Sequence, residues 1–467
     1  MKTIFTIFTI SFFALQVNAQ CWSKVSSGFT HTVAIATNGT LWAWGDSSSG
    51  QLGDGTLIEK YTPIQIGTAN NWIDVVASGD FSIALRENGV LGTSKTLWAW
   101  GGNYYGQLGD GTNTRKLIPT QIGGVADWQQ ITVGNDHVLA IKATGVLGAN
   151  RFLFAWGRNN EGQLGDGTIT NSNTPIQITN DNNWEQVDAG ENFSVGLKTN
   201  GKIYSWGGNQ AGQLGVGTLI NVGAPNQIGI DANWSKIAAG IDHVLATKTN
   251  GTLYSWGGNL NGQLGIGAAG TQSTPVQVGT ATNWLHIAAG GAFSICSKTN
   301  GTLFSWGVNG TGQLGINSLV TTLIRTQIGS GSSWTNPFSA GYINASAIQT
   351  DGSLWTWGNN QNGQLGIGTN LLKTIPTQVN CPAVLSIEEN TINDTAFSIY
   401  PNPAADGLFS IQSKNEIQEV KAYDMLGKQI EIEKNNDSFK INASSGIYNI
   451  IITDSEGIIQ NKKLIIK

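Results

Sequence analysis

The chain has 467 residues, enough for two or three domains, and it combines 62 glycines with only 12% charged residues. Its formal net charge of −5 gives no electrostatic basis for binding nucleic acid or an anionic membrane. The first segment, residues 1–19, has a basic Lys2, an apolar stretch from Ile4 to Leu15 and a small-residue end at Ala19. The stretch is too short to span a bilayer, so we predict a signal peptide and a mature protein that does not cross a membrane. The alternative is a buried helix.

A glycine-rich block recurs along the next 360 residues or so. The letters GQLG start at Gly50, Gly106, Gly162, Gly212, Gly262, Gly312 and Gly363. Tryptophans mark the same repeat at Trp22, Trp72, Trp128, Trp184, Trp234, Trp284 and Trp334. Both sets have seven members spaced by 50 to 56 residues, and a period of this length is typical of propellers and solenoids.

Each copy of the repeat contains about four strand patterns. In the fifth copy these patterns lie at Ser235–Ala238, His243–Lys248, Thr252–Trp256 and Thr274–Val278. Asn250-Gly251 separates the second from the third, and this dipeptide favours a two-residue hairpin with positive φ at both positions. Four antiparallel strands in each copy form one blade of a β-propeller.

The two ends of the repeat region favour a closed ring. An open solenoid needs atypical end repeats, whereas the first and seventh copies resemble the others. Cys21 precedes the first copy and Cys381 follows the last, and these ends meet only in a ring. We therefore predict an all-β, seven-bladed β-propeller over residues 20–381 with a Cys21–Cys381 disulfide, which export permits. The alternative is two free thiols. Cys296 replaces Ala or Gly of other copies and is predicted to be a small buried residue.

The repeated block resembles the regulator of chromosome condensation repeat family over about residues 22–380. The matching residues are G-x-x-H/F, a small apolar strand, N-G, and L-W/Y-x-W-G-x-N-x-x-G-Q-L-G-x-G. The resemblance implies a seven-bladed propeller whose common theme is partner binding. The guanine-nucleotide exchange of the founding member is not carried over, because the sequence has neither a basic tail nor a long insertion within a blade. Secreted members that inhibit β-lactamases suggest an alternative role as an inhibitor of a secreted enzyme.

The composition changes after Cys381, where charged residues become more frequent and tryptophan disappears. Residues 382–396 are predicted to be a linker, and residues 397–467 contain short strand patterns typical of a small β-sandwich. The segments YPNPAADGLFSI, VKAYDMLGKQI, SSGIYNIIITD and KKLIIK resemble the C-terminal sorting domain of type IX secretion. This resemblance implies a Bacteroidota-type bacterium, contact with the type IX secretion machinery through residues 397–467, and a location outside the cell or on the outer-membrane surface. The alternative is an ordinary adhesive sandwich.

The sequence offers little material for catalysis, and we predict no catalytic residue, no metal and no cofactor. No helical pattern follows the glycine-rich block, so it is not a phosphate-binding loop. One repeat position holds His31, His137 and His243 but Phe or Asn in other copies, which favours packed histidines over a metal site. Three aspartates after GQLG are predicted to stabilise turns: Asp54, Asp110 and Asp166.

The second and third copies each contain six extra residues after the hairpin glycine, VLGTSK (90–95) and VLGANR (146–151). We predict that these lengthened loops and the nearby Arg86, Lys95, Arg151 and Arg158 contact a protein or cell-surface ligand. The alternative is harmless loop growth. The sequence thus favours an exported binding or adhesion module. Inhibition of a secreted enzyme is one alternative, and an enzyme acting on polysaccharide is another, which would need carboxylates meeting at the mouth of the ring.

Overall fold

A computed structural model of the protein describes residues 21–88, 94–124, 127–145, 148–331, 333–381, 397–413, 415–424, 428–435, 438–455 and 459–466. The predicted signal peptide and the predicted linker lie outside these residues. The chain divides into two compact units, one ending at Pro382 and the other beginning at Ala383. The regular elements of the described residues are β-strands, and those residues include no helix of the length and apolarity that crossing a membrane requires.

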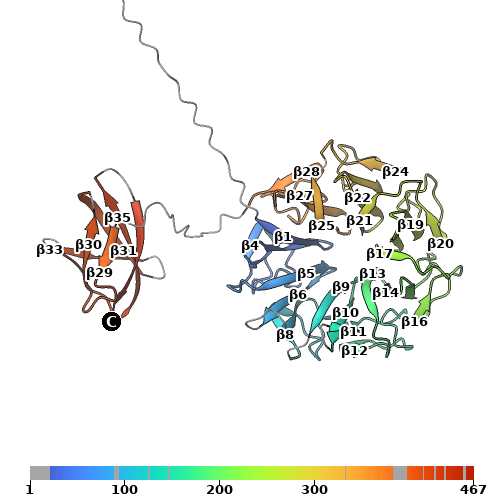
Figure 1. Ribbon diagram of the computed structural model, residues 1–467, viewed down its shortest axis with the longest axis horizontal. Coiled ribbons are helices and arrows are strands. Elements are labelled where there is room, and N and C mark those ends of the chain that lie inside the picture. Colours follow the sequence, from blue (N-terminus) through green and yellow to red (C-terminus); the bar gives the residue numbers. More distant parts are fainter. Residues whose placement is uncertain are drawn as a thin grey trace, which may run out of the picture. The chain divides into compact units, whose positions relative to one another are not determined.

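The first unit is a ring of seven four-stranded antiparallel sheets, counted over the described residues (Figure 1). Each sheet, or blade, contains four strands that follow one another in the chain. Blades one to four comprise β1 (Trp22–Ser27), β2 (His31–Ala36), β3 (Leu41–Gly45), β4 (Lys60–Gln65), β5 (Trp72–Ser78), β6 (Phe81–Asn88), β7 (Ser94–Gly101), β8 (Lys116–Ile122), β9 (Trp128–Val133), β10 (His137–Thr144), β11 (Asn150–Gly157), β12 (Ser172–Gln177), β13 (Trp184–Ala189), β14 (Phe193–Lys198), β15 (Ile203–Gly207) and β16 (Val222–Gln227). Blades five to seven comprise β17 (Trp234–Ala239), β18 (His243–Lys248), β19 (Leu253–Gly257), β20 (Gln272–Gln277), β21 (Trp284–Ala289), β22 (Phe293–Lys298), β23 (Leu303–Gly307), β24 (Thr322–Gln327), β25 (Trp334–Ala340), β26 (Asn344–Gln349), β27 (Leu354–Gly358) and β28 (Lys373–Val379). The predicted propeller is therefore confirmed.

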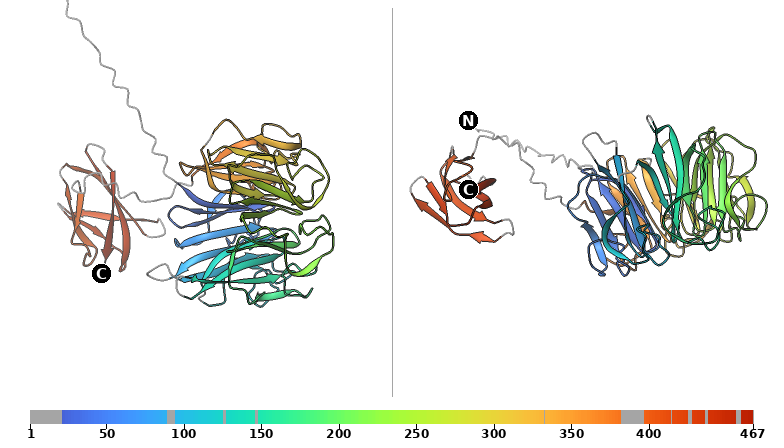
Figure 2. Two further views of the ribbon diagram at one scale, coloured as in Figure 1. Left: turned by 45° about the vertical axis from the view of Figure 1, so that its right-hand side comes forward. Right: turned by 90° about the horizontal axis from the view of Figure 1, so that it is seen from below.

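The ring closes where the first blade meets the seventh. The innermost strand β1 contacts β5 on one side and β25 on the other, and the turned views show the blades side by side (Figure 2). Ser27 N donates to Ser339 Oγ across this junction at 3.0 Å. Cys21 and Cys381 form the predicted disulfide, with 5.9 Å between their Cα atoms. Because every blade is built from consecutive strands, hydrogen bonds, side-chain packing and this disulfide join the ends without any exchange of strands.

The hairpins of blades one and four to seven differ from the predicted two-residue type. In the fifth blade, Gly251 N donates to Lys248 O at 2.9 Å and Lys248 N donates to Thr252 O at 3.0 Å. Gly251 has φ 77°, but Asn250 is not among the non-glycine residues with positive φ. This is a longer turn in which only the glycine is left-handed. Asn250 contributes through its side chain instead, because its Oδ1 accepts from Thr252 N at 3.1 Å.

The blades expose two distinct faces. The inner strands run toward a face that carries the GQLG loops, such as residues 208–221, and we call it the loop face. The opposite face carries the Asn-Gly turns, such as residues 199–202, and we call it the hairpin face. On the hairpin face, blades two and three have longer hairpins, since β6, β7, β10 and β11 each have eight residues where the equivalent strands elsewhere have five or six.

The tryptophans hold the blades together. Trp256 is fully buried, and its Nε1 donates to Gln213 O of the previous blade at 3.0 Å. Trp234 packs edge-on against Tyr254 at 5.2 Å, and Lys248 Nζ lies 4.8 Å from the centre of the Trp234 ring. Each GQLG block therefore supplies a carbonyl to the next blade, which explains its recurrence without any bound phosphate.

The second unit consists of two four-stranded sheets in its described residues, with strand orders β29-β30-β34-β33 and β32-β31-β35-β36. Phe409 and Phe439 stack at 5.7 Å in a core that also contains Ile450 and Leu464, so residues of both sheets are buried together as in a sandwich. The strands are β29 (Phe397–Tyr400), β30 (Leu408–Ser413), β31 (Ile417–Tyr423), β32 (Gln429–Ile430), β33 (Ile432–Asn435), β34 (Ser438–Ile441), β35 (Gly446–Asp454) and β36 (Ile459–Ile466).

Candidate functional site

The histidines at the shared repeat position lie in three different blade junctions. Nε2 of His31, His137 and His243 lies 2.8, 3.0 and 3.0 Å from the Oγ of a serine in the next blade. Each serine hydroxyl donates in turn to a glutamine carbonyl, so Nε2 must carry the hydrogen. Nδ1 of each ring is buried and has no hydrogen-bonding partner in the part of the chain that the structure describes. These histidines are neutral packing residues whose Nδ1 makes no hydrogen bond to the described residues, and only in His243 is a carboxylate oxygen recorded within 4.0 Å of it, Asp242 Oδ1 at 3.9 Å.

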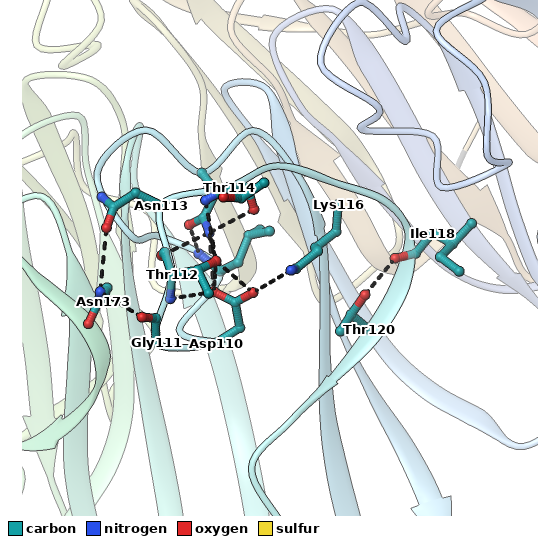
Figure 3. A network of polar contacts seen from close by, with 11 residues as sticks. Asp110, Gly111, Thr112, Asn113, Thr114, Lys116, Ile118, Thr120 and Asn173 are labelled. Carbon is teal, nitrogen blue, oxygen red and sulfur yellow. Dashed lines mark hydrogen bonds and ion pairs between the residues drawn. The ribbon is translucent and has the colours of Figure 1, made fainter.

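The aspartates after GQLG organise their loops, as Figure 3 shows for Asp110. Asp110 Oδ1 accepts from Thr112 N at 2.9 Å and from Thr112 Oγ1 at 2.8 Å, and Asp110 Oδ2 pairs with Lys116 Nζ at 3.0 Å. Burial disfavours the charged carboxylate, but these contacts outweigh burial and hold the pKa of Asp110 below its ordinary value. Asp54 and Asp166 accept equivalent bonds from Thr56 and Thr168. Within the described ranges no group of three or more His, Cys, Asp or Glu residues could hold a metal.

The four basic residues predicted to contact a partner do not form one surface. Arg86, Lys95 and Arg151 lie on the hairpin face, whereas Arg158 follows the end of β11 on the loop face. Arg151 and Arg158 are separated by about 20 Å along that strand, given a rise of about 3.3 Å per residue. Sequence proximity was misleading here because a strand carries the chain from one face to the other.

The contacts of each basic side chain show whether it is held within its own blade or extends over the next one. Arg86 lies 5.7 Å from the ring centre of Trp72 and donates to Asn71 Oδ1 at 2.6 Å, so it is held within its own blade. Lys95 and Arg151 reach over the next blade instead. Lys95 Nζ donates to Gln129 Oε1 at 3.1 Å. Arg151 forms an ion pair with Glu185, and both side chains remain more than a third exposed.

A cleft of about 610 Å³ lies at the mouth of the central channel on the hairpin face. The lengthened hairpin of blade three forms one wall through Arg151, and the inner strands of blades three to six, together with Ile141 of β10, form the rest. Gln130, Gln186, Lys236 and His286 line it. Residues 90–93, 146 and 147 of the two inserted segments lie outside the described residues.

The channel continues toward the loop face as a cavity of about 300 Å³ lined by all seven inner strands. Asp188 is buried there and links three blades, because Thr132 Oγ1 donates to its Oδ1 at 2.7 Å and Ala239 N donates to its Oδ2 at 2.8 Å. Burial raises the pKa of Asp188 despite these bonds. The Asp188 carboxylate therefore holds neighbouring blades together.

Carboxylates gather near the loop-face mouth of the channel. Burial raises the pKa of Asp136 to about 6, and the neighbouring Asp80 and Glu191 add to the rise while Arg158 opposes it. Arg158 Nη1 lies 3.7 Å from Asp136 Oδ2, and its guanidinium lies 5.2 Å from the centre of the Tyr105 ring. Sequence reasoning had not paired Asp136 with Arg158, since they belong to different strands. Their nearness follows from the antiparallel pairing of β10 with β11.

The two faces differ in charge. Basic residues outnumber acidic ones on the hairpin face. The basic residues there are Lys24, Arg86, Lys95, Lys142, Arg151, Lys198, Lys202, Lys236, Lys248 and Lys298, and the acidic ones are Asp74, Glu87, Asp127, Asp181, Glu185, Asp231 and Asp351. On the loop face the balance is reversed. Its acidic residues are Asp46, Asp54, Glu59, Asp80, Asp110, Asp136, Glu161, Asp166, Glu191 and Asp242, and its basic ones are Lys60, Arg115, Lys116, Arg158, Arg325 and Lys373. The hairpin face thus favours anionic partners.

Comparisons with known proteins agree with this architecture. The chain is 32% identical over 156 residues to the ultraviolet-B receptor UVR8 of Arabidopsis thaliana, covering 33% of each chain. It is 29% identical over 157 residues to the human E3 ubiquitin-protein ligase HERC2, covering 33% of this chain and 3% of HERC2. The matched segment therefore spans a third or less of these curated relatives.

Solved structures share the fold. Human WBSCR16 superposes with a TM-score of 0.64 at 22% identity, covering 73% of this chain and 95% of WBSCR16. Yeast RCC1 (Prp20), solved with Kap60, gives a TM-score of 0.63 at 20% identity, covering 85% of this chain and 93% of that one.

Family matches cover both units. Regulator of chromosome condensation (RCC1) repeats match residues 22–51, 38–85 and 96–141. The secretion system C-terminal sorting domain matches residues 398–467, in agreement with the predicted type IX sorting domain. The RCC1-like domain matches residues 146–396, more than half of the chain. With its blades, its GQLG links and its sorting domain in place, the chain belongs to the RCC1-like domain family and ends in a secretion sorting domain.

Proposed function

We propose that this protein is an exported binding module that recognises a protein partner at the hairpin face of its propeller. The observation that carries the proposal is the cleft of about 610 Å³ at the channel mouth, walled by a hairpin that the sequence lengthens. Ligand sites are concave and few in a protein, and loops on a rigid scaffold are where binding residues concentrate. A related propeller also binds proteins, since yeast Prp20 binds Kap60, Gsp1p and histones.

The place of action follows from the C-terminal domain. A sorting domain of type IX secretion supports export to the outer-membrane surface or the medium, with residues 397–467 meeting the secretion machinery. The Cys21–Cys381 disulfide is compatible with an oxidising location. Of the basic residues singled out in the sequence, Lys95 and Arg151 are the ones proposed to face the partner.

Affinity capture with the full chain tests the proposal. A variant lacking residues 90–95 and 146–151 copies the shorter hairpins of the other five blades, so it should fold. The control is Leu260→Ser, which alters a side chain on the loop face that is 79% exposed. We expect the deletion to abolish capture of a partner from culture medium or cell surface while the control retains it. Equal capture by both would refute the hairpin-face assignment.

A hydrolytic role on polysaccharide is a second candidate, and the carboxylates at the loop-face mouth favour it. A carboxyl with a pKa of about 6 beside other carboxylates has the chemistry of a general acid. In this case Asp136→Asn would abolish release of reducing sugar ends from extracellular polysaccharide. An absence of such release by the unaltered protein across acidic, neutral and sulfated polysaccharides would end this candidate.

A further inference from the structure

In blades one, three, four and five the third residue of the inner strand forms a hydrogen bond to the next blade on the hairpin face. In blade one, Lys24 Nζ lies 2.8 Å from Asp74 Oδ1 of blade two, which gives an ordinary ion pair. In blade four the position holds Gln186, whose Nε2 donates to Ile237 O at 2.9 Å and whose Oε1 accepts from Ile237 N at 3.2 Å. In both blades the polar or charged group of this side chain is therefore paired within the protein.

Blade five carries a lysine at this position without the acidic partner. Lys236 Nζ donates to Leu285 O and lies 3.2 Å from Nδ1 of His286, which occupies the position that Asp74 holds in blade two. A lysine ammonium has three hydrogens and these contacts use two of them. Among the described residues Lys236 forms no ion pair, and Glu185, a carboxylate that lines the same cleft, is paired with Arg151.

The neighbouring histidine adds a neutral hydrogen-bond donor to the site. Burial and the adjacent Lys236 lower the pKa of His286 to about 4, so the ring is neutral at pH 7. Its Nδ1 accepts from the ammonium, which leaves the hydrogen on Nε2 as a second donor at the cleft. Burial also lowers the pKa of Lys236. A part-buried cation without a counter-charge is costly, and an anionic ligand would relieve that cost.

We infer that Lys236 and His286 bind the C-terminal carboxylate of a protein partner, entering the cleft along the channel axis. The inference rests on the proposed function. A carboxylate accepts from both donors, and the excess of basic residues on the hairpin face would attract it. The cleft lies at the mouth of an axial channel, which a C-terminus can enter as a single polypeptide end. An internal Asp or Glu side chain fits less well, because polypeptide flanks it on both sides. An acidic sugar fits less well, because the described residues that line the cleft include no Trp, Tyr or Phe ring for stacking. Leu285, 39% exposed next to the site, offers an apolar contact to the terminal side chain.

An array of N-acetylated tetrapeptides tests this directly on the full chain. The last residue is varied over all twenty amino acids, and every peptide is measured as the free acid and as the C-terminal amide. We expect the binding peptides to prefer the free acid by on the order of tenfold or more, as for a charge-assisted hydrogen bond. Lys236→Gln should remove that preference. Its fold is secure because Gln130 and Gln186 already occupy the same position.

Lys24→Gln is the matched control, since it removes a hairpin-face cation from the same position in a blade outside the cleft. It should keep the preference for the free acid. Four outcomes would each overturn the inference. They are equal binding of acids and amides, equal loss of the preference for the free acid in both variants, binding only of amides that end in Asp or Glu, and binding of an oligouronate in place of the peptides. If the array fails while the hairpin deletion still abolishes capture, the carboxylate site is wrong and the proposed partner surface stands. If the deletion also has no effect, both are wrong.

Discussion

The three histidines at the blade junctions should make the propeller sensitive to acid. Burial lowers the pKa of His31 and His243 to about 4 and that of His137 to about 3, whereas each is about 6.5 in the unfolded chain. Since the folded-state pKa is depressed, this contribution to stability is fully present above pH 6.5 and is lost as the pH falls toward 4. By pH 4 a shift of this size is worth roughly 3 kcal/mol for each histidine.

The physical cause is the unpaired Nδ1. Protonation there would place a charge in a buried junction where Nδ1 has no hydrogen-bonding partner among the described residues, although His243 has Asp242 Oδ1 at 3.9 Å as a partial counter-charge. Together the three sites amount to roughly 9 kcal/mol, comparable with the entire stability of a typical domain. We therefore expect the free energy of unfolding to fall steeply between pH 6.5 and pH 4.

The chain itself supplies the control. In alternate junctions a buried phenylalanine replaces the histidine and a valine replaces the serine, as with Phe81 and Val138 or Phe193 and Val244. A variant carrying this change at all three histidine junctions replaces six residues. The changes are His31→Phe with Ser82→Val, His137→Phe with Ser194→Val, and His243→Phe with Ser294→Val.

Denaturant titrations at pH 8 and pH 4.5, followed by tryptophan fluorescence, measure the difference. All 17 tryptophans lie between Trp22 and Trp357, so the signal reports the propeller and not the C-terminal domain. The unaltered protein should lose much more stability at pH 4.5 than the variant does. Carboxylates such as Asp136 titrate in both proteins and cancel in the comparison. Parallel losses in the two proteins would refute the role of the histidines.

Three further results are expected. Cys21→Ser with Cys381→Ser opens a closed loop of 360 residues and should cost up to about 6 kcal/mol in the chain-entropy model, measured by denaturation with and without reductant. An unchanged midpoint would show that packing alone closes the ring. Asn344→His should stabilise the seventh junction by about 1 kcal/mol. The buried Asn344 amide has no partner in the described residues, whereas a histidine ring at this position could donate to the Thr32 hydroxyl. A lower denaturation midpoint would contradict this. Asp136→Asn should raise stability at pH 8 by no more than about 3 kcal/mol, since a carboxyl with a raised pKa loses stability as the pH rises through 4 to 6, and the gain should vanish at pH 4.

The sequence by itself determined the architecture. The spacing of GQLG and of the tryptophans set the number of blades, and the position of Cys21 and Cys381 at the two ends predicted the ring and its disulfide. Such features are readable because a repeat must present the same packing surface to the same neighbour every 50 residues or so. The tail was equally readable, since its segments matched a sorting domain that the family comparison also finds.

Only the tertiary structure decided which residues share a surface. Arg151 and Arg158 are seven positions apart yet lie on opposite faces, because one strand separates them. Lys236 and His286 are 50 positions apart yet touch, because successive inner strands are neighbours in the ring. Burial and missing counter-charges are properties of such junctions between blades, and a linear pattern does not contain them.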